Sequence, residues 1–286
     1  MSMKRHVLPE KPWLVVAAVA GLIIGVALIS GFFRSTDTLF SCSLGGYLAP
    51  TVTGNPPAAQ IQQLAILHYA TTKVVPQQSL GEIRISYDVL QSRSPCNFLV
   101  FGLGHDSLMW ASFNARGKTL FLEEDPKWVQ TVLRNAPDLR AHTVKYRTRL
   151  SEADDLLVSY RSEPECSASK SYIRNNEKCR LALTGLPDEV YDTEWDLLMI
   201  DAPRGYFPEA PGRMGAIYSA AVMARNRKGP GVTHVFLHDV DRKVEKVFAE
   251  EFLCRKYLVN GSGRLWHFAI PSAANASAGV GGFKFC

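Results

Sequence analysis

An apolar run that ends in two glycines is the part of this sequence best suited to holding a ligand. The run at 97–101 leads into Gly102 and Gly104, and a segment with helical spacing follows. Glycines at such a strand-to-helix turn let backbone amides approach a ligand where no side chain blocks them. A second apolar run, about twenty residues on, ends in Glu123, and an acid there commonly binds ribose hydroxyls. The spacing predicts a nucleoside-cofactor site formed by Gly102, Gly104, Asp106 and Glu123.

Acidic side chains and a histidine follow two later apolar runs. Asp201 comes directly after 197–200, and His238 and Asp239 come directly after 235–237. A carboxylate at the end of a buried strand costs free energy unless it has a partner. Such groups can be structural, as a loop cap or a core histidine, or they can face a cleft. We take Asp201, His238 and Asp239 as candidate catalytic residues.

Two chemistries suit these three residues if the two strands are neighbours. Asp201 or His238 could remove the proton from a sugar hydroxyl as its oxygen attacks a methyl group. Alternatively, Asp201 and Asp239 could hold a divalent metal ion that acidifies the hydroxyl. The residue types are compatible with both chemistries, and the sequence does not choose between them.

The segment after Asp201 carries candidate substrate contacts. Arg204 and Arg213 could bind the carboxylate of a uronic acid through paired hydrogen bonds. Tyr206 could stack on a sugar ring. The alternative is that both arginines lie on the surface near a helix start and that the tyrosine packs beneath the loop. On the first interpretation the substrate is an acidic sugar.

The elements that must position these residues alternate between strand and helix. Apolar runs and helical spacing predict seven strands with helices between them. The strands are expected at 97–101, 118–122, 142–146, 195–200, 233–238, 256–260 and 264–270, and the helices at 106–114, 126–135, 151–160, 212–226 and 241–252. This order implies a parallel sheet with helices on both faces. Ligands of such sheets bind beyond the carboxyl ends of the strands.

The connection at 260–263 is too short for a helical crossover, so the last two strands form a hairpin. One of them must then run antiparallel to the others, unlike the six-stranded dinucleotide-binding fold. The expected fold class is α/β, with a seven-stranded sheet similar to that of class I S-adenosylmethionine-dependent methyltransferases. A polar stretch at 161–190 interrupts the alternation as an insertion, and Cys166 and Cys179 within it are the expected disulfide.

The uncharged apolar segment 13–33 predicts one transmembrane anchor. As a helix it would be roughly 31 Å long, which matches the apolar thickness of a bilayer. Lys4, Arg5 and Lys11 precede it and favour a cytosolic N-terminus. A cleaved signal peptide is the alternative, but its apolar region is normally shorter. The expected division is a cytosolic tail (1–12), the anchor (13–33), a stem (34–58), a lumenal domain (59–271) and a flexible tail (272–286).

A lumenal domain agrees with two further features. Asn260 and Asn275 each begin a glycosylation acceptor motif, and the six cysteines are an even set. The net charge of +5 comes without any basic run. Nucleic-acid binding is therefore set aside as a function.

Four stretches together resemble the plant glucuronoxylan 4-O-methyltransferase family and its irregular-xylem relatives. They are PQQS at 76–79, CNFLVFGLGHDS at 96–107, DAP and EAPGRM at 201–203 and 209–214, and VFLHDV at 235–240. The resemblance runs from about Ala65 to Cys286. It implies a single-pass type II Golgi membrane protein that acts on xylan in the secondary cell wall and uses S-adenosylmethionine as methyl donor. Gly102, Gly104 and Glu123 match the cofactor-binding positions of the family.

One segment departs from the methyltransferase branch. Residues 204–209 (RGYFPE) resemble the irregular-xylem branch, whose members are linked to xylan formation. The leading hypothesis is S-adenosylmethionine-dependent 4-O-methylation of glucuronic acid side chains, with glucuronoxylan or an acidic xylo-oligosaccharide as substrate. The alternative is a non-catalytic component of a Golgi xylan-synthesising assembly, with other xylan-synthesis proteins as partners.

Overall fold

The computed structural model describes residues 58–170, 172–273 and 285–286. The predicted cytosolic tail and anchor lie outside these residues, as do most of the stem and most of the C-terminal tail. Within the described ranges, no helix combines the length and the apolar character needed to cross a membrane.

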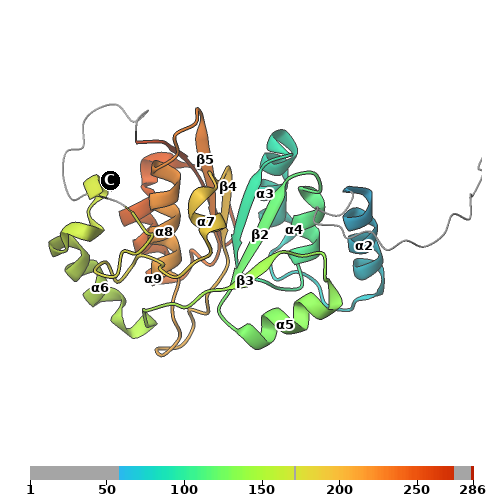
Figure 1. The fold of residues 1–286 in the computed structure, drawn as a ribbon, viewed down its shortest axis with the longest axis horizontal. Helices are drawn as coiled ribbons and strands as arrows, with labels where there is room; N and C mark the ends of the chain where they lie inside the picture. Colours follow the sequence, from blue (N-terminus) through green and yellow to red (C-terminus); the bar gives the residue numbers. More distant parts are fainter. Residues whose placement is uncertain (1–57, 171, 274–284) are drawn as a thin grey trace, which may run out of the picture. The chain divides into compact units, whose positions relative to one another are not determined.

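Seven strands form one sheet in the order β3-β2-β1-β4-β5-β7-β6 (Figure 1). They are β1 (Asn97–Phe101), β2 (Lys118–Glu123), β3 (Ala141–Thr143), β4 (Leu197–Ile200), β5 (Val232–Leu237), β6 (Leu258–Ser262) and β7 (Leu265–Pro271). β1 to β5 pair in parallel, whereas β7 is antiparallel to both β5 and β6. The predicted seven-stranded sheet with a C-terminal hairpin is therefore confirmed.

Helices cover both faces of the sheet, because its central strands are apolar on both sides. Phe98 and Val100 of β1 pack on one face, whereas Leu99 and Phe101 pack on the other. The first face is covered by α2 (Ala58–Thr71), α3 (Leu80–Arg93), α4 (Ser107–Phe113) and α5 (Pro126–Asn135). The second is covered by α6 (Ala153–Ser159), α7 (Asp188–Asp192), α8 (Met214–Arg225) and α9 (Lys243–Phe248). Such two-sided burial explains why the strands read as continuous apolar runs.

Two elements differ in an informative way from the sequence pattern. β3 ends at Thr143, because the chain then leaves the sheet and Leu150 N donates to Ala210 O of the loop after β4 (2.7 Å). The helix predicted at 241–252 is α-helical only to Phe248 and continues as a π-helical turn to Leu253. That turn stops at Cys254, whose φ of 73° cannot continue a right-handed helix.

Two disulfides fasten the second face. The predicted bond between Cys166 and Cys179 is confirmed, and it closes a loop within the 161–190 insertion, whose first part consists of short 3-10 turns. A second bond, between Cys254 and Cys286, was not predicted. It holds the chain's end against the core, where Phe285 is buried. Sequence spacing could not reveal this pair, because its members are brought together only by packing.

Candidate active site

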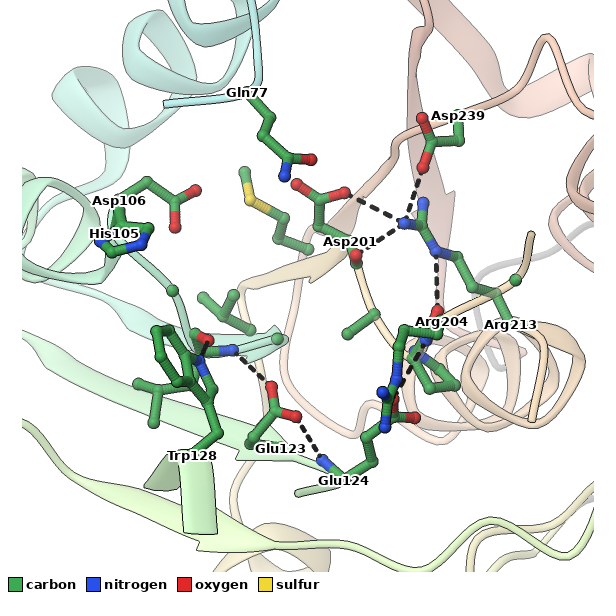
Figure 2. Close-up of a pocket in the computed structure, with 18 of the residues that line it drawn as sticks. Gln77, His105, Asp106, Glu123, Glu124, Trp128, Asp201, Arg204, Arg213 and Asp239 are labelled. Carbon is green, nitrogen blue, oxygen red and sulfur yellow. Dashed lines mark hydrogen bonds and ion pairs between the residues drawn. The ribbon is translucent and has the colours of Figure 1, made fainter. Parts of the chain in front are cut away.

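A pocket of about 570 Å³ opens at the carboxyl ends of the parallel strands. It is lined by the segments that follow β1, β2, β4 and β5 and by residues 74–77, which precede α3 (Figure 2). Pockets of roughly 300–1,000 Å³ commonly hold cofactors and small substrates. The pocket therefore lies where the sheet geometry predicts a ligand, and it is large enough for one.

Gly102 makes the turn out of β1. Its φ is 126°, in the region that L side chains rarely adopt, and a Cβ there would lie 3.3 Å from the Cβ of Ala202. Gly104 lines the same pocket. Because neither residue has a side chain, the loop backbone stays open toward the pocket, as the sequence analysis expects.

Glu123 ends β2 and faces this loop. One carboxylate oxygen accepts from the amide of Leu103 (3.1 Å), and the other accepts from the amides of Glu124 (2.9 Å) and Asp125 (3.1 Å). Burial raises the pKa of its carboxyl. A carboxylate has about four acceptor positions, so Glu123 retains capacity for ribose hydroxyls. The residues present therefore fit a nucleoside cofactor.

Asp106 and Trp128 complete this half of the pocket (Figure 2). Asp106 accepts from the indole nitrogen of Trp110 (2.8 Å), and burial together with the charge of Asp201 raises the pKa of its carboxyl. Trp128 donates from its own indole nitrogen to Leu103 O (2.6 Å). The sequence analysis missed Trp128. Its only signal was an aromatic residue in the first turns of the helix after Glu123.

Asp201 lies at the end of β4, with its carboxylate at the pocket wall. One oxygen accepts from His238 Nδ1 (2.9 Å) and from the guanidinium of Arg213 (3.2 Å), and the other accepts from Gln78 Nε2 (3.0 Å). Burial by itself raises the pKa of this carboxyl, but the hydrogen bond from His238 and the charge of Arg213 lower it overall. Asp201 is thus an oriented anion that faces the pocket.

His238 lies behind Asp201 and is 1% exposed. It is not among the residues that line the pocket, and its Nε2 lies 3.5 Å from a carboxylate oxygen of Glu82. This position corrects the expectation that His238 contacts substrate as a base. Its ring nitrogens face three carboxylates, those of Asp201 (2.9 Å), Asp239 (3.6 Å) and Glu82 (3.5 Å), and this position suits a residue that orients Asp201.

Arg213 is the second correction. Its side chain is 5% exposed, and it donates to the carbonyls of Asp201 (2.6 Å) and His238 (2.7 Å) while pairing with Asp239 (2.8 Å). Because this guanidinium already binds two carbonyls and a carboxylate of the protein, it cannot also offer two parallel N–H groups to a uronic carboxylate. The sequence analysis grouped Arg213 with Arg204 because both precede the same helix, but the loop directs the two side chains differently.

Arg204 and Tyr206 do lie at the mouth of the pocket. The Arg204 side chain is 52% exposed and pairs through Nε with Glu124. Tyr206 is 68% exposed, and its ring meets that of Phe207 edge to face. Both positions are compatible with the predicted contacts to an acidic sugar.

The metal alternative has a candidate ligand set, because ligand atoms of Asp201, His238 and Asp239 lie within 4.8 Å of one another. However, Asp239 already pairs with Arg213 (2.8 Å), Arg242 (3.0 Å) and Arg264 (2.6 Å). A divalent cation would have to displace these guanidinium groups. The geometry therefore favours proton removal by a carboxylate over metal binding at this cluster.

Gln78 and Glu82 support the site, and the sequence analysis did not single them out. Glu82 forms a capping box with Ser79 at the start of α3 and also accepts from the amide of Arg264 (2.7 Å). The spacing Ser-x-x-Glu signals the helix start. It cannot reveal that the same carboxylate reaches the β6–β7 turn and His238.

The ion pair of His238 predicts a dependence of stability on pH. Burial by itself lowers the pKa of His238, but the hydrogen bond and charge of Asp201 and the charge of Asp239 raise it above 6.5. A histidine whose pKa is higher in the folded protein than in the unfolded one stabilises the fold. This contribution is complete below pH 6.5, and it is lost as the pH rises through the pKa of the folded state. We expect the free energy of unfolding to fall as the pH rises from 6.5 through the folded pKa of His238.

Urea denaturation at a series of pH values measures this effect, with His238→Gln as the comparison. The buried His234 and His267 do not interfere, because burial lowers the pKa of each to about 4. An alkaline slope of the same size in His238→Gln would contradict the assignment.

The sheet order, the reversed β7 and the glycine turn beside Glu123 define the class I S-adenosylmethionine-dependent methyltransferase fold. Within that class, the chain belongs to the IRX15/IRX15L/GXM family, whose model matches residues 81–268. Among solved structures, a TehB-like SAM-dependent methyltransferase from Corynebacterium glutamicum is similar, with a TM-score of 0.36 at 13% identity, over 75% of this chain and 96% of that chain.

Three relatives from Arabidopsis thaliana show where the chain stands in the family. It is 64% identical to Arabinogalactan O-methyltransferase 1, over 97% of this chain and 98% of the relative. It is 50% identical to Glucuronoxylan 4-O-methyltransferase 1, over 78% of each chain. It is 36% identical to Protein IRREGULAR XYLEM 15, over 99% of this chain and 81% of the relative.

These identities confirm the predicted family and the prediction of an enzyme, since the two more similar relatives are named O-methyltransferases. They do not support the placement in the irregular-xylem branch. That placement depended on the six-residue stretch 204–209, whereas identity along the whole chain is far higher to the methyltransferases. A short loop at a pocket mouth is a poor guide to the branch, because such loops vary more than the scaffold.

Proposed function

We propose that this protein transfers a methyl group from S-adenosylmethionine to a hydroxyl of a glucuronic acid residue in an acidic arabinogalactan. The observation that carries the proposal is one pocket with a nucleoside-type half (Gly102, Glu123) and an oriented carboxylate, Asp201, across from it. Identity of 64% along nearly the whole chain favours arabinogalactan as the polymer. Arg204 at the mouth supports an acidic sugar, because its pairing with Glu124 is made by Nε and its side chain is half exposed.

S-adenosylmethionine, when bound, supplies an electrophilic methyl group. Glu123 and the open backbone at 102–104 would hold the adenosine portion. Asp201 would hold the acceptor hydroxyl and take up its proton, since its carboxylate is anionic and faces the pocket. His238, Arg213 and Gln78 would keep that carboxylate in one orientation.

Glucuronoxylan 4-O-methylation is the second candidate, and 50% identity to Glucuronoxylan 4-O-methyltransferase 1 favours it. The test is methyl transfer by the purified protein to two acceptors, a glucuronic-acid-capped arabinogalactan oligosaccharide and a glucuronosyl xylo-oligosaccharide. Faster transfer to the first supports the proposal, and faster transfer to the second supports xylan. Cofactor binding without transfer to either would favour the non-catalytic alternative.

The cellular setting is also a proposal. We infer a Golgi membrane protein with its domain in the lumen, supported by the charge distribution around 13–33 and by the acceptor motif at Asn260, which lies exposed on the edge strand β6. Removal of N-glycans from the protein in plant microsomes would shift its electrophoretic mobility if this inference is right.

Glu123 provides a direct test of the cofactor half. We expect Glu123→Gln to weaken S-adenosylmethionine binding by roughly 10–100-fold, because hydrogen bonds to a charged acceptor contribute about 1.5–3 kcal/mol. Calorimetric titration measures the change, and the exposed Glu209→Gln is the control. Unchanged binding in Glu123→Gln would remove this residue from the site.

A further inference from the structure

Residues 74–78, which connect α2 to α3, form one wall of the pocket. Val74, Val75, Pro76 and Gln77 line it. Figure 2 shows the Gln77 side chain pointing into the pocket, toward the region between Asp106 and Asp201. In the described part of the chain, no side chain or backbone group forms a hydrogen bond with the side-chain amide of Gln77. Its donor and acceptor groups are both available to a ligand.

The neighbouring residue fixes the position of Gln77. Gln78 is 4% exposed and donates from Nε2 to the carboxylate of Asp201 (3.0 Å). Directly after Gln78, the capping box of Ser79 and Glu82 holds the start of α3. Because the chain is anchored directly after Gln77, the side chain is presented to the pocket from a defined backbone position.

Sheet order shows which part of the pocket Gln77 serves. Gly102 and Glu123, the nucleoside-type residues, follow β1 and β2, whereas Asp201 follows β4 on the other side of β1. The bond between Gln78 and Asp201 therefore places Gln77 beside the carboxylate that faces the acceptor. An ionised carboxylate such as that of Asp201 can only accept hydrogen bonds, whereas an amide both donates and accepts, as sugar hydroxyls do.

We propose that Gln77 is a specificity-determining residue that hydrogen-bonds the acceptor sugar next to the reacting hydroxyl. The inference rests on the proposed function, since it takes the acceptor to be a uronic acid. Gln77 acts on the acceptor and not on the cofactor. Its neutral amide also adds no negative charge to the wall that already carries Asp106 and Asp201, which suits an acidic acceptor.

The experiment compares Gln77→Leu and Gln77→Glu in the full-length protein, with Gln62→Leu on α2 as a matched exposed control. We expect Gln77→Leu to lower kcat/KM for the acidic acceptor about 10-fold, the value of one lost hydrogen bond. The Kd for S-adenosylmethionine should change less than about twofold. Gln77→Glu should lose more, because it adds a negative charge facing a uronate.

A second acceptor isolates the charge effect. With the methyl ester of the uronic acid as acceptor, Gln77→Glu should lower kcat/KM no more than Gln77→Leu does. A merely structural defect would instead lower kcat/KM equally for both acceptors. Equal kcat/KM for wild type and Gln77→Leu, or a weakened Kd for S-adenosylmethionine, would overturn the inference while leaving the proposed function in place. If the wild type methylates no acidic acceptor, the proposed function fails and the inference fails with it.

Discussion

Asp201→Asn is expected to lower kcat for methyl transfer by about 10²–10⁴-fold, the usual contribution of a positioned general base. The asparagine occupies the same volume but is not a base. It also places an amide beside three donors, His238, Arg213 and Gln78, that need an acceptor. The effect should be seen in kcat measured at saturating acceptor.

The Kd for S-adenosylmethionine separates a catalytic loss from an unfolded protein. It should change little in Asp201→Asn, because the nucleoside-type residues follow other strands. Asp241→Asn, at an exposed carboxylate in the segment after the neighbouring strand β5, is the matched control and should retain full activity. A kcat within about threefold of wild type in Asp201→Asn would exclude a base of this strength, since general bases contribute far more.

Arg213→Ala should reduce the free energy of unfolding by about 3–5 kcal/mol, the usual cost of removing one partner from a buried ion pair. The side chain is 5% exposed and pairs with Asp239 and Asp201. Its removal also leaves the carbonyls of Asp201 and His238 without this donor. Denaturation in urea, followed by circular dichroism, measures the loss.

Arg204→Ala is the contrasting variant. The Arg204 side chain is 52% exposed, whereas that of its partner Glu124 is 10% exposed. Because one member of this pair remains in contact with water, its loss should reduce stability less than the loss of Arg213, whose side chain and whose partner Asp239 are both buried. KM for an acidic acceptor should rise. If Arg204→Ala and Arg213→Ala had equal effects on stability, the distinction between the pocket-mouth arginine and the buried arginine would be wrong.

Local pattern was sufficient to place Gly102, Gly104 and Glu123 at the pocket. Gly102, Gly104 and Glu123 each follow directly from an apolar run that must end, so their position at a strand tip is encoded within a few residues. The alternation of strand and helix predicted the parallel sheet, because hydrophobic periodicity identifies each element. The short connection at 260–263 predicted the reversed last strand, because loop length constrains how two strands can be joined.

Tertiary structure alone decided the roles of the remaining residues. The sequence analysis took His238 as a catalytic candidate and Arg204 and Arg213 as substrate contacts, but the direction of each side chain depends on how the loops fold over one another. Gln77 and Gln78 come from a connection more than a hundred residues before Asp201, and only the packing of α3 on the sheet brings them to it. Contacts across such distances depend on the whole core, and no local spacing encodes them.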